Sequence, residues 1–440
     1  MATKTDKPSP KTVLVLGASY AGISAAHYTL KHILPSLPNN GSTYTVTLVS
    51  PNSTFFARPA SPRALVSDSL LPTAKCFMDF QTSFAKYGPD KFRFVQGVAT
   101  NLDYVARSVT VAKTDGSEER LEYYALVIAT GGRTASPLLG LHKDETLVKE
   151  AWARFQAALG EAKSIVIAGG GPAGIETAGE LGQHLNGRAG WFQRKLENPK
   201  VAVTVVNADA KILPILRPAI ALQAEKYLAK VGVSVIKNVK VEGVTPEGTG
   251  SGDATSAGLE QVVQRATVKL SNGDTIDCDL YIPATGVVPN TGFLPADLLT
   301  EKGHVDTNPK TLRVDKAGPR VYAVGDVGSY TRGGILDLYD AVPVAMVNMK
   351  RDLLYFATAG EDVDVEKIPI KGEDKLYKPN LTESQVVPIG TSKGVGAFFG
   401  WRLPSIMVWL IKGRDYMLSL QGPIVDGSKW DKETKWKFEV

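Results

Sequence analysis

One repeated unit restricts the fold of this chain more than any other feature of the sequence. An apolar stretch that ends in a glycine-rich turn, VLVLGASYAG (13–22), is followed by a second apolar stretch that ends in Ala-Thr-Gly, LVIATGG (126–132). The same pair returns as IVIAGGGPAG (165–174) and YIPATG (281–286). Short apolar runs that each meet a glycine turn are typical of buried parallel strands in a doubly wound sheet. The repeat therefore predicts an α/β fold with two similar halves.

The first glycine turn has the form Gly17-x-Ser19-x-Ala21-Gly22 and lies between an apolar strand and a helix-like stretch, 23–34. In a dinucleotide-binding turn the first glycine permits the bend and the second position lets a pyrophosphate approach the backbone. The helix that follows supplies free N–H groups at its N-terminus. The first turn departs from the usual Gly-x-Gly-x-x-Gly at its second glycine, so a plain strand-to-helix turn is the alternative.

The second turn, Gly169-x-Gly171-x-x-Gly174, matches the fingerprint completely and has the same strand and helix context. In this fold an acidic residue after the next strand binds a ribose hydroxyl, whereas a cation there admits the 2′-phosphate of NADPH. The two corresponding positions are Ser50 and Asn207, which are neither acidic nor basic. The sequence thus predicts two nucleotides without deciding between NADH and NADPH.

Further candidate cofactor residues follow other predicted strands. Thr130 and Gly131 close the first Ala-Thr-Gly stretch and Gly286 closes the second. In VYAVGD, Gly325 precedes Asp326, whose carboxylate could accept hydrogen bonds from ribityl hydroxyls. An ordinary Gly-Asp turn is the alternative for this last pair.

Composition excludes several classes of protein. The two cysteines, Cys76 and Cys278, lie far apart, so a Cys-x-x-Cys dithiol relay and a cysteine-rich metal site are not expected. The net charge of +5 is scattered, which argues against nucleic-acid binding. No apolar run reaches the length of about 18 residues that a membrane span needs. We expect a cytoplasmic protein whose first twelve residues form a polar tail.

Taken together, the motifs resemble the flavin-dependent NAD(P)H oxidoreductases of the apoptosis-inducing-factor type, especially the ferroptosis-suppressor (AMID) branch and its fungal relatives. This group has the pyridine nucleotide-disulfide oxidoreductase fold without the redox cysteines. The resemblance covers nearly the whole chain, and its most specific part is GVGAFFGWRLPSIMVWLIKGRDY (394–416). It implies FAD, NADH or NADPH, and a quinone or other small electron acceptor. A homodimer and a peripheral membrane contact stay open.

On this basis we expect an α/β protein with two Rossmann-like dinucleotide-binding domains and a small C-terminal domain. The discontinuous FAD-binding domain comprises 1–145 and 284–340, and the NAD(P)H-binding domain comprises 146–283. The C-terminal domain is 341–440. A chain of 440 residues is in any case too long for one hydrophobic core.

The resemblance also implies roles for four charged residues. Glu176 matches a glutamate that faces the cofactors, and Lys412 matches a lysine that approaches the flavin. A cation there would stabilise the anionic reduced ring, and a carboxylate could position the nicotinamide or carry a proton. Arg58 and Arg63 lie in the loop that touches the flavin in similar proteins. The alternatives are a carboxylate that serves the helix dipole, a surface lysine beside Asp415, and solvated loop arginines.

The apolar segment 398–411 favours core packing over a quinone entrance or a membrane-facing surface. The tail 429–440 mixes Trp430, Trp436 and Phe438 with lysines, so weak association with anionic lipid is a further hypothesis.

The expected mechanism is ping-pong: hydride passes from the nicotinamide to the flavin, the oxidised nicotinamide leaves, and a quinone-like acceptor reoxidises the flavin. The alternatives are a reductase of a ferredoxin- or rubredoxin-type protein, and a signalling protein with residual redox activity.

Overall fold

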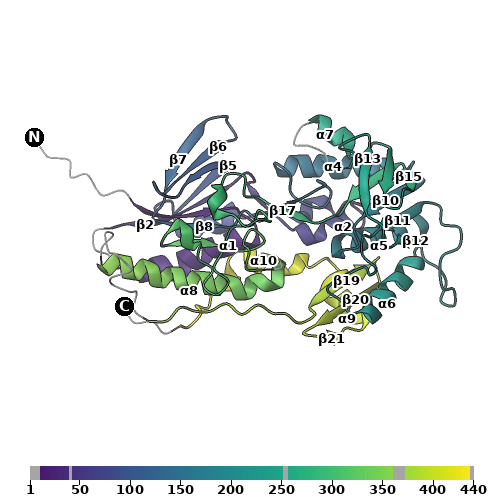
Figure 1. Cartoon of the computed structure of the whole chain (residues 1–440). Helices are drawn as coiled ribbons and strands as arrows, with labels where there is room; N and C mark the ends of the chain where they lie inside the picture. The colour runs from purple at the N-terminus through teal and green to yellow at the C-terminus, as the bar shows by residue number, and fades with distance from the viewer. Residues whose placement is uncertain (1–9, 39–41, 251–255, 332, 360–371, 437–440) are drawn as a thin grey trace, which may run out of the picture.

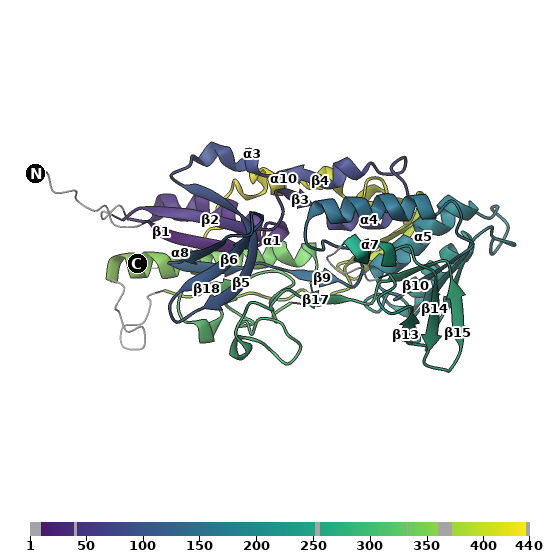
Figure 2. The ribbon, with the colours of Figure 1, turned by 90° about the horizontal axis from the view of Figure 1, so that it is seen from above.

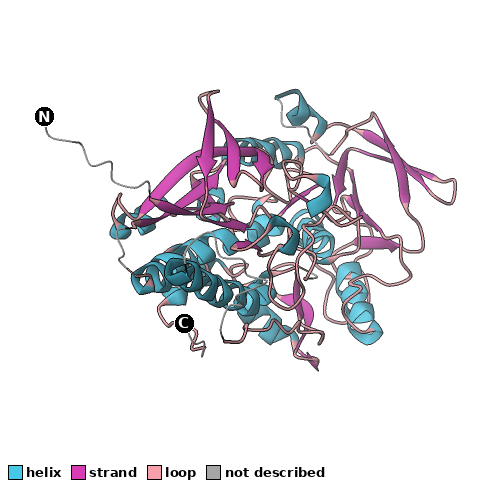
Figure 3. Ribbon diagram, turned by 60° about the vertical axis from the view of Figure 1, so that its left-hand side comes forward, coloured by secondary structure: helices cyan, strands magenta, loops and turns pink. Residues whose placement is uncertain are grey.

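The computed structural model describes residues 10–38, 42–250, 256–331, 333–359 and 372–436. Most of the predicted N-terminal tail and Phe438 lie outside these residues. Two α/β lobes lie side by side (Figure 1), and helices alternate with strands in both of them (Figure 3). The predicted fold class is confirmed: Rossmann-like parallel sheets form the centre of each lobe.

The first lobe is built on a seven-stranded sheet. The strands, in spatial order, are β18 (Val321–Ala323), β8 (Ala125–Ile128), β1 (Lys11–Leu16), β2 (Tyr44–Ser50), β5 (Phe92–Asp103), β6 (Ser108–Lys113) and β7 (Glu118–Glu122). The first five strands pair in parallel, and β5, β6 and β7 form an antiparallel meander. The meander matches the alternation of apolar and polar residues along that stretch.

Strand β1 is buried on both faces, as its continuous apolar sequence predicts. Val13 and Val15 pack into a cluster with α1 (Tyr20–Tyr28) and α8 (Ile335–Ala359). Leu14 and Leu16 pack on the opposite face, against the meander and residues that follow β17 (Val287–Pro289). The sheet is therefore the central layer of the first lobe.

The second lobe repeats this arrangement on a smaller scale. A four-stranded parallel sheet has the order β12 (Val233–Ile236), β11 (Ala202–Val206), β10 (Ser164–Ala168) and β16 (Leu280–Pro283). Beside it lies an antiparallel meander of β13 (Val241–Thr245), β14 (Ala266–Leu270) and β15 (Thr275–Cys278). Its helices are α4 (Glu145–Ala158), α5 (Pro172–Asn186), α6 (Pro218–Ala229) and α7 (Ser256–Gln261). Helix α4 begins after Asp144, whose carboxylate accepts N–H groups of the first turn.

Two features join the lobes. Strand β9 (Gly132–Thr134) pairs with β17 where the chain passes between them, and Figure 2 shows this pair in the middle of the molecule. The second feature is the stretch after β3 (Thr54–Phe56), which includes α2 (Ser61–Ala64) and ends before β4 (Phe77–Asp79). Its apolar side chains pack into the core of the second lobe, and α2 packs against α5. Arg63, the charged residue of α2, is thereby placed next to the second lobe.

Residues 341–440, predicted as a C-terminal domain, contact both lobes. Helix α8, in which this range begins, packs along α1. The sheet of β19 (Gln385–Ile389), β20 (Lys393–Phe398) and β21 (Trp401–Arg402) packs on α5 and α6, as the yellow strands in Figure 1 show. The chain then passes through α9 (Ser405–Val408), a π-helical turn (Trp409–Gly413) and α10 (Gly422–Val425) back to α1. The remaining short α-helix is α3 (Gln81–Phe84). Among the described helices, none is both long and apolar enough to cross a membrane.

Candidate active site

Most of the predicted cofactor residues lie at the carboxyl edges of the two parallel sheets, where ligands bind in this class of fold. In the first lobe Ser50 is the last residue of β2, and Gly17, Thr130 and Asp326 follow the neighbouring parallel strands β1, β8 and β18. In the second lobe the residues after β10, β11 and β16 occupy the equivalent edge. Because parallel strands end on the same side of a sheet, segments that are far apart in sequence meet at each edge.

The two glycine turns have the same geometry. Gly17 has φ +105°, and a Cβ atom on Gly22 would overlap the carbonyl oxygen of Gly17. Gly169 has φ +121°, and a Cβ atom on Gly174 would overlap the carbonyl oxygen of Gly169. Only glycine combines such backbone conformations with so close an approach. The first turn is therefore a dinucleotide-type turn despite its missing second glycine.

Both turns leave room at the position where a pyrophosphate approaches. Ser19, which precedes α1, is exposed, and its side chain caps no N–H group of that helix within the described chain. Gly171 precedes α5, and a Cβ atom built on it would have no described atom within 4 Å. The N-terminal N–H groups of both helices are thus accessible to an anionic group.

Two buried polar side chains near the first turn lack a hydrogen-bond partner among the described residues. They are the amide of Asn52 and the hydroxyl of Tyr20. Burial raises the pKa of the Tyr20 hydroxyl well above its ordinary value. The hydroxyl of Ser50 accepts the N–H of Asn52 at 3.2 Å, so it helps to fix this turn. Buried polar groups normally have partners, and these two therefore fit a polar ligand such as the ribose end of a nucleotide.

The VYAVGD turn lies next to the first glycine turn. Gly325 has φ +88°, and a Cβ atom on it would lie 3.1 Å from that of Ala21. The Asp326 carboxylate accepts the N–H of Gly334 at 3.2 Å, which leaves further acceptor positions. Burial lowers the pKa of Arg58, and the charge of Asp326 opposes this effect. The structure thus brings Arg58, Asp326 and the first glycine turn into one site.

Asn207 and Thr130 use their side chains within the protein. Asn207 accepts the N–H of Gly170 at 3.2 Å, and its amide group donates to the backbone carbonyls of two residues in the following loop. The hydroxyl of Thr130 donates to the carbonyl of Asn290 at 2.8 Å, and the N–H of Asn290 donates to the carbonyl of Gly131. Both residues therefore brace turns at the sheet edges. Sequence reasoning did not identify Asn290.

Gly286 lies at the carboxyl edge of the second sheet, after β16. Gly286 has φ +113°, and a Cβ atom on it would meet no described atom within 4 Å, so the backbone there is open to a ligand. Cys76 and Cys278 are both buried and unpaired. Burial raises the pKa of the Cys76 thiol to about 12 and that of Cys278 to about 11. Neither thiol is suited to act as a nucleophile at neutral pH.

Glu176 and Lys412, which lie 236 positions apart, form an ion pair of 2.5 Å. Glu176 is in α5 and Lys412 is in the π-helical turn after α9. Burial raises the pKa of Glu176 to about 7, while the charge and hydrogen bond of Lys412 oppose the rise. The structure thus brings together two of the four charged residues to which the resemblance gives a role.

Arg63 points into a buried cluster next to this pair. Its guanidinium donates to Glu180 at 2.8 Å and to the carbonyl of Gly413 at 2.7 Å. The Tyr416 hydroxyl donates to the same oxygen of Glu180 at 3.0 Å. Sequence reasoning did not identify Glu180 or Tyr416. The spacing of four residues between Glu176 and Glu180, which places both on one face of α5, was a usable signal for Glu180.

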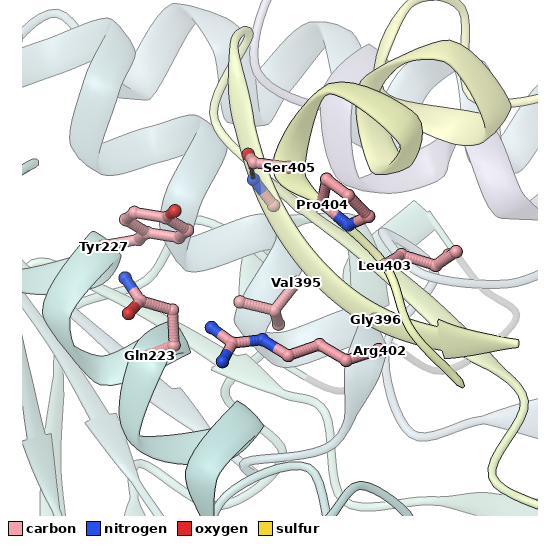
Figure 4. A pocket seen from close by; sticks show the side chains of 9 residues that line it. Gln223, Tyr227, Val395, Gly396, Arg402, Leu403, Pro404 and Ser405 are labelled. Carbon is pink, nitrogen blue, oxygen red and sulfur yellow. Dashed lines mark hydrogen bonds between the residues drawn. The ribbon is translucent and has the colours of Figure 1, made fainter. Parts of the chain in front are cut away.

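A separate cavity of about 240 Å³ lies between α6 and the C-terminal sheet. Figure 4 shows Arg402 and Gln223 reaching into it, with Tyr227 and Ser405 on its other sides. None of the residues predicted to bind a cofactor lines this cavity. It is therefore distinct from the two sheet edges.

The expectation of core packing for 398–411 is wrong for most of its large side chains. The sheet β19–β21 presents one face to α5 and α6, so side chains at its tip and on the outer side of α9 face solvent. The exposed residues are Phe398, Phe399, Trp401, Ile406, Met407 and Leu410. We call these six residues the apolar patch. Trp430, from the tail, is instead buried against Tyr28.

Comparison with known proteins assigns the chain to a family. A model described as pyridine nucleotide-disulphide oxidoreductase matches residues 11–346. The chain belongs to this family. It is an oxidoreductase that uses FAD and NAD(P)H, and the predicted cofactors are confirmed. The family resemblance also explains why two similar dinucleotide-type turns occur in one chain.

Individual proteins resemble almost the entire chain. Oxidoreductase phnG of Penicillium herquei is 51% identical over 98% of this chain and 100% of its own length. Ferroptosis suppressor protein 1 of Xenopus tropicalis is 26% identical over 95% of this chain and 97% of its own. The solved structure of NDH2 from Plasmodium falciparum, in complex with NADH, superposes with a TM-score of 0.61 at 14% identity and covers 97% of this chain and 99% of that one. At this identity the structural likeness concerns the fold alone.

Proposed function

We propose that this protein is an NAD(P)H:quinone oxidoreductase of the apoptosis-inducing-factor and ferroptosis-suppressor type. The observation that carries the proposal is the buried Lys412–Glu176 pair, which joins the nucleotide-binding helix α5 to the C-terminal segment. Ferroptosis suppressor protein 1 of Xenopus tropicalis and apoptosis-inducing factor 1 of Saccharomyces cerevisiae, at 26% and 23% identity, support it.

The residues present fit the two cofactors. FAD would be held by the turn at Gly17, by the unpartnered amide of Asn52, and by Arg58 and Asp326. The nicotinamide dinucleotide would be held by the turn that contains Gly171. When bound, these groups supply hydride transfer between nicotinamide and flavin and electron transfer to the acceptor.

Lys412 would stabilise negative charge that develops during the reaction, and Glu176 would take up and release a proton. The Lys412 ammonium holds a positive charge where little water reaches it, and such a charge stabilises negative charge that develops nearby. Because the pKa of Glu176 is raised to about 7, its carboxyl group can both hold and release a proton near neutral pH. Reduction of a quinone to a quinol consumes two protons, so a proton-carrying group beside the acceptor suits this reaction.

The apolar patch supports a lipophilic acceptor. It extends along β20, β21 and α9 and reaches the turn that carries Lys412. Residues 384–414 contain no Asp or Glu, and besides Lys412, which is buried against Glu176, this stretch carries three cations, Lys393, Arg402 and Arg414. Apolar side chains together with cations suit the surface of an anionic membrane. We therefore propose that this cytoplasmic enzyme contacts a membrane at the patch and receives its quinone there.

The activity is tested on purified protein by visible spectroscopy. We expect a flavin spectrum that bleaches with NADH or NADPH in the absence of oxygen and returns on addition of ubiquinone or menadione. The Gly171→Leu variant should keep its flavin but not bleach, because the added side chain fills the space at the second turn. Reoxidation by an iron-sulfur protein but by no quinone would contradict the quinone assignment.

The membrane contact is tested by flotation with vesicles of anionic or neutral lipid. Trp401→Ser should weaken binding to anionic vesicles, since Trp401 is 80% exposed within the patch. Phe192→Ser is the matched control, because Phe192 is 96% exposed but lies after α5, outside the patch. No flotation, together with a dimer in sedimentation that Trp401→Ser dissociates, would show that a second copy covers the patch instead.

A further inference from the structure

A buried charged cluster connects three parts of the chain next to the proposed active site. It consists of Arg63 from α2, Glu180 from α5, and Tyr416 from the C-terminal segment. The side chains of Arg63 and Glu180 are 5% and 0% exposed, and the Arg63 guanidinium lies over the Tyr416 ring at 4.6 Å. The cluster thus fixes the relative positions of all three segments.

The cluster holds the chain on the C-terminal side of Lys412. Arg63 donates to the carbonyl of Gly413, the next residue, at 2.7 Å. The N–H of Tyr416 donates to the carbonyl of Lys412 itself at 2.7 Å. On the other side of the pair, Glu180 lies one helical turn after Glu176. Both members of the Lys412–Glu176 pair are therefore anchored by residues of the cluster.

Stability alone is a weak explanation for such a cluster. A buried ion pair is often replaced by apolar residues without loss of stability, because removing two charges from water offsets most of their attraction. In addition, Glu180 Oε2 and Arg63 Nε are buried without a hydrogen-bond partner among the described residues. A core selected only for stability would satisfy or eliminate these atoms. What the cluster does provide is orientation, since a guanidinium can bind a carboxylate and a carbonyl at fixed angles.

We propose that Arg63, Glu180 and Tyr416 are positioning residues that fix the Lys412 ammonium against Glu176. The proposal rests on the function proposed above. The three residues act through Lys412 and Glu176 and do not themselves contact the reacting atoms. Arg63 belongs to a segment of the first lobe. Through Arg63, that lobe helps to fix the Lys412 ammonium, which pairs with Glu176 of the second lobe.

Four variants of the full-length protein separate positioning from folding. Arg63→Met removes the guanidinium and leaves Glu180 bonded only to the Tyr416 hydroxyl, and the double variant Arg63→Met with Glu180→Gln removes both charges. Arg63→Lys keeps the charge but lacks the planar fork that directs two N–H groups at fixed angles toward Glu180 and the carbonyl of Gly413. Tyr416→Phe keeps the ring and removes only the hydroxyl. Arg93→Met is the matched control, because Arg93 forms an ion pair with Glu119 at the surface of the first lobe.

The first measurement is independent of turnover. Reaction of lysine amines with an acylating reagent is followed by mass spectrometry, with the 65% exposed Lys195 as internal reference. Lys412 is 13% exposed and ion-paired, so it should react slowly in the wild-type protein. Its rate should rise toward that of Lys195 in Arg63→Met and in the double variant, and rise less in Arg63→Lys and Tyr416→Phe. Arg93→Met should leave it unchanged.

The second measurement is the kinetics of quinone reduction. Misplacement of Lys412 should lower kcat on the order of 10- to 100-fold in Arg63→Met with a smaller change in KM for NAD(P)H, and Arg63→Lys should recover part of the loss. The pH profile of kcat should shift in the same variants, because the environment of Glu176 changes with Lys412.

Unchanged Lys412 reactivity and kcat in Arg63→Met and the double variant would overturn the positioning role. If Arg63→Met does not fold, the double variant and Tyr416→Phe carry the comparison. A wild-type protein that binds flavin but reduces no quinone would refute the proposed function, whereas the labelling result would still decide whether the cluster positions Lys412.

Discussion

The titration of Glu176 should make the folded protein less stable as the pH rises. Its pKa is about 7 in the folded protein, because burial outweighs the opposing effect of Lys412, and 4.5 is the ordinary value. Below pH 4.5 the group is protonated in both states and its contribution is fully present. Between pH 4.5 and about 7 the unfolded chain releases the proton first, so stability falls by about 1.4 kcal/mol per pH unit. The total loss is about 3 kcal/mol.

The assay is urea unfolding at pH values from 4.5 to 9, followed by tryptophan fluorescence with saturating FAD. Glu176→Gln removes the titrating group, so the difference in unfolding free energy between this variant and the wild type should change with pH by about 3 kcal/mol and level off above about pH 7. The control is Glu119→Gln, which removes a carboxylate from an ion pair at the surface and so tests whether the loss of any paired carboxylate reproduces the effect. Parallel curves for wild type and Glu176→Gln would refute the argument that this carboxyl group is buried at a high energetic cost.

Three further predictions concern the glycine turn, the unpartnered amide and a helix cap. Gly22→Ala should abolish flavin binding, seen as a colourless protein, because the added methyl group overlaps the carbonyl oxygen of Gly17; a yellow variant would contradict the assigned turn. Asn52→Leu should raise the Kd for FAD by about tenfold or more without lowering the unfolding temperature of the flavin-free protein, because its amide has no described partner within the protein; unchanged FAD affinity would remove Asn52 from the site. Asp144→Ala should lower the free energy of unfolding by about 1 kcal/mol at unchanged kcat, because it removes the acceptor for two N–H groups of α4; an equal stability would show that solvent replaces the cap.

The parts of the protein that sequence reasoning predicted are those encoded by local residues. Each glycine turn needs a positive φ at its first glycine and a close backbone approach at its last, and these requirements restrict the residue type directly. Apolar runs such as the one in β1 likewise identify strands that are buried on both faces. For this reason the fold class and the two dinucleotide-type turns could be inferred before any contact between distant residues was known, and the resemblance carried by these motifs implied the cofactors.

Only the tertiary structure decided the contacts between segments that are distant in sequence. Arg63 and Glu180 lie 117 positions apart, and Glu180 and Tyr416 lie 236 apart, so no local pattern relates them. The path of α2 across to the second lobe gives Arg63 buried partners, so it is neither the solvated loop arginine that was the alternative nor a residue whose partners could be read from the loop sequence.

The dependence on contacts between distant segments also explains why core packing was wrongly predicted for residues 398–411. An apolar run indicates that some of its side chains are buried. It does not show which of them pack against other parts of the protein and which stay exposed. The packing of one face of the C-terminal sheet on α5 and α6 leaves Trp401 and its neighbours outside. The sequence by itself predicted that two nucleotides bind, because nucleotide binding depends on short turns, and the family resemblance supplied their identity as FAD and NAD(P)H. The placement of the charges around Lys412 was decided by the way three separate segments pack together.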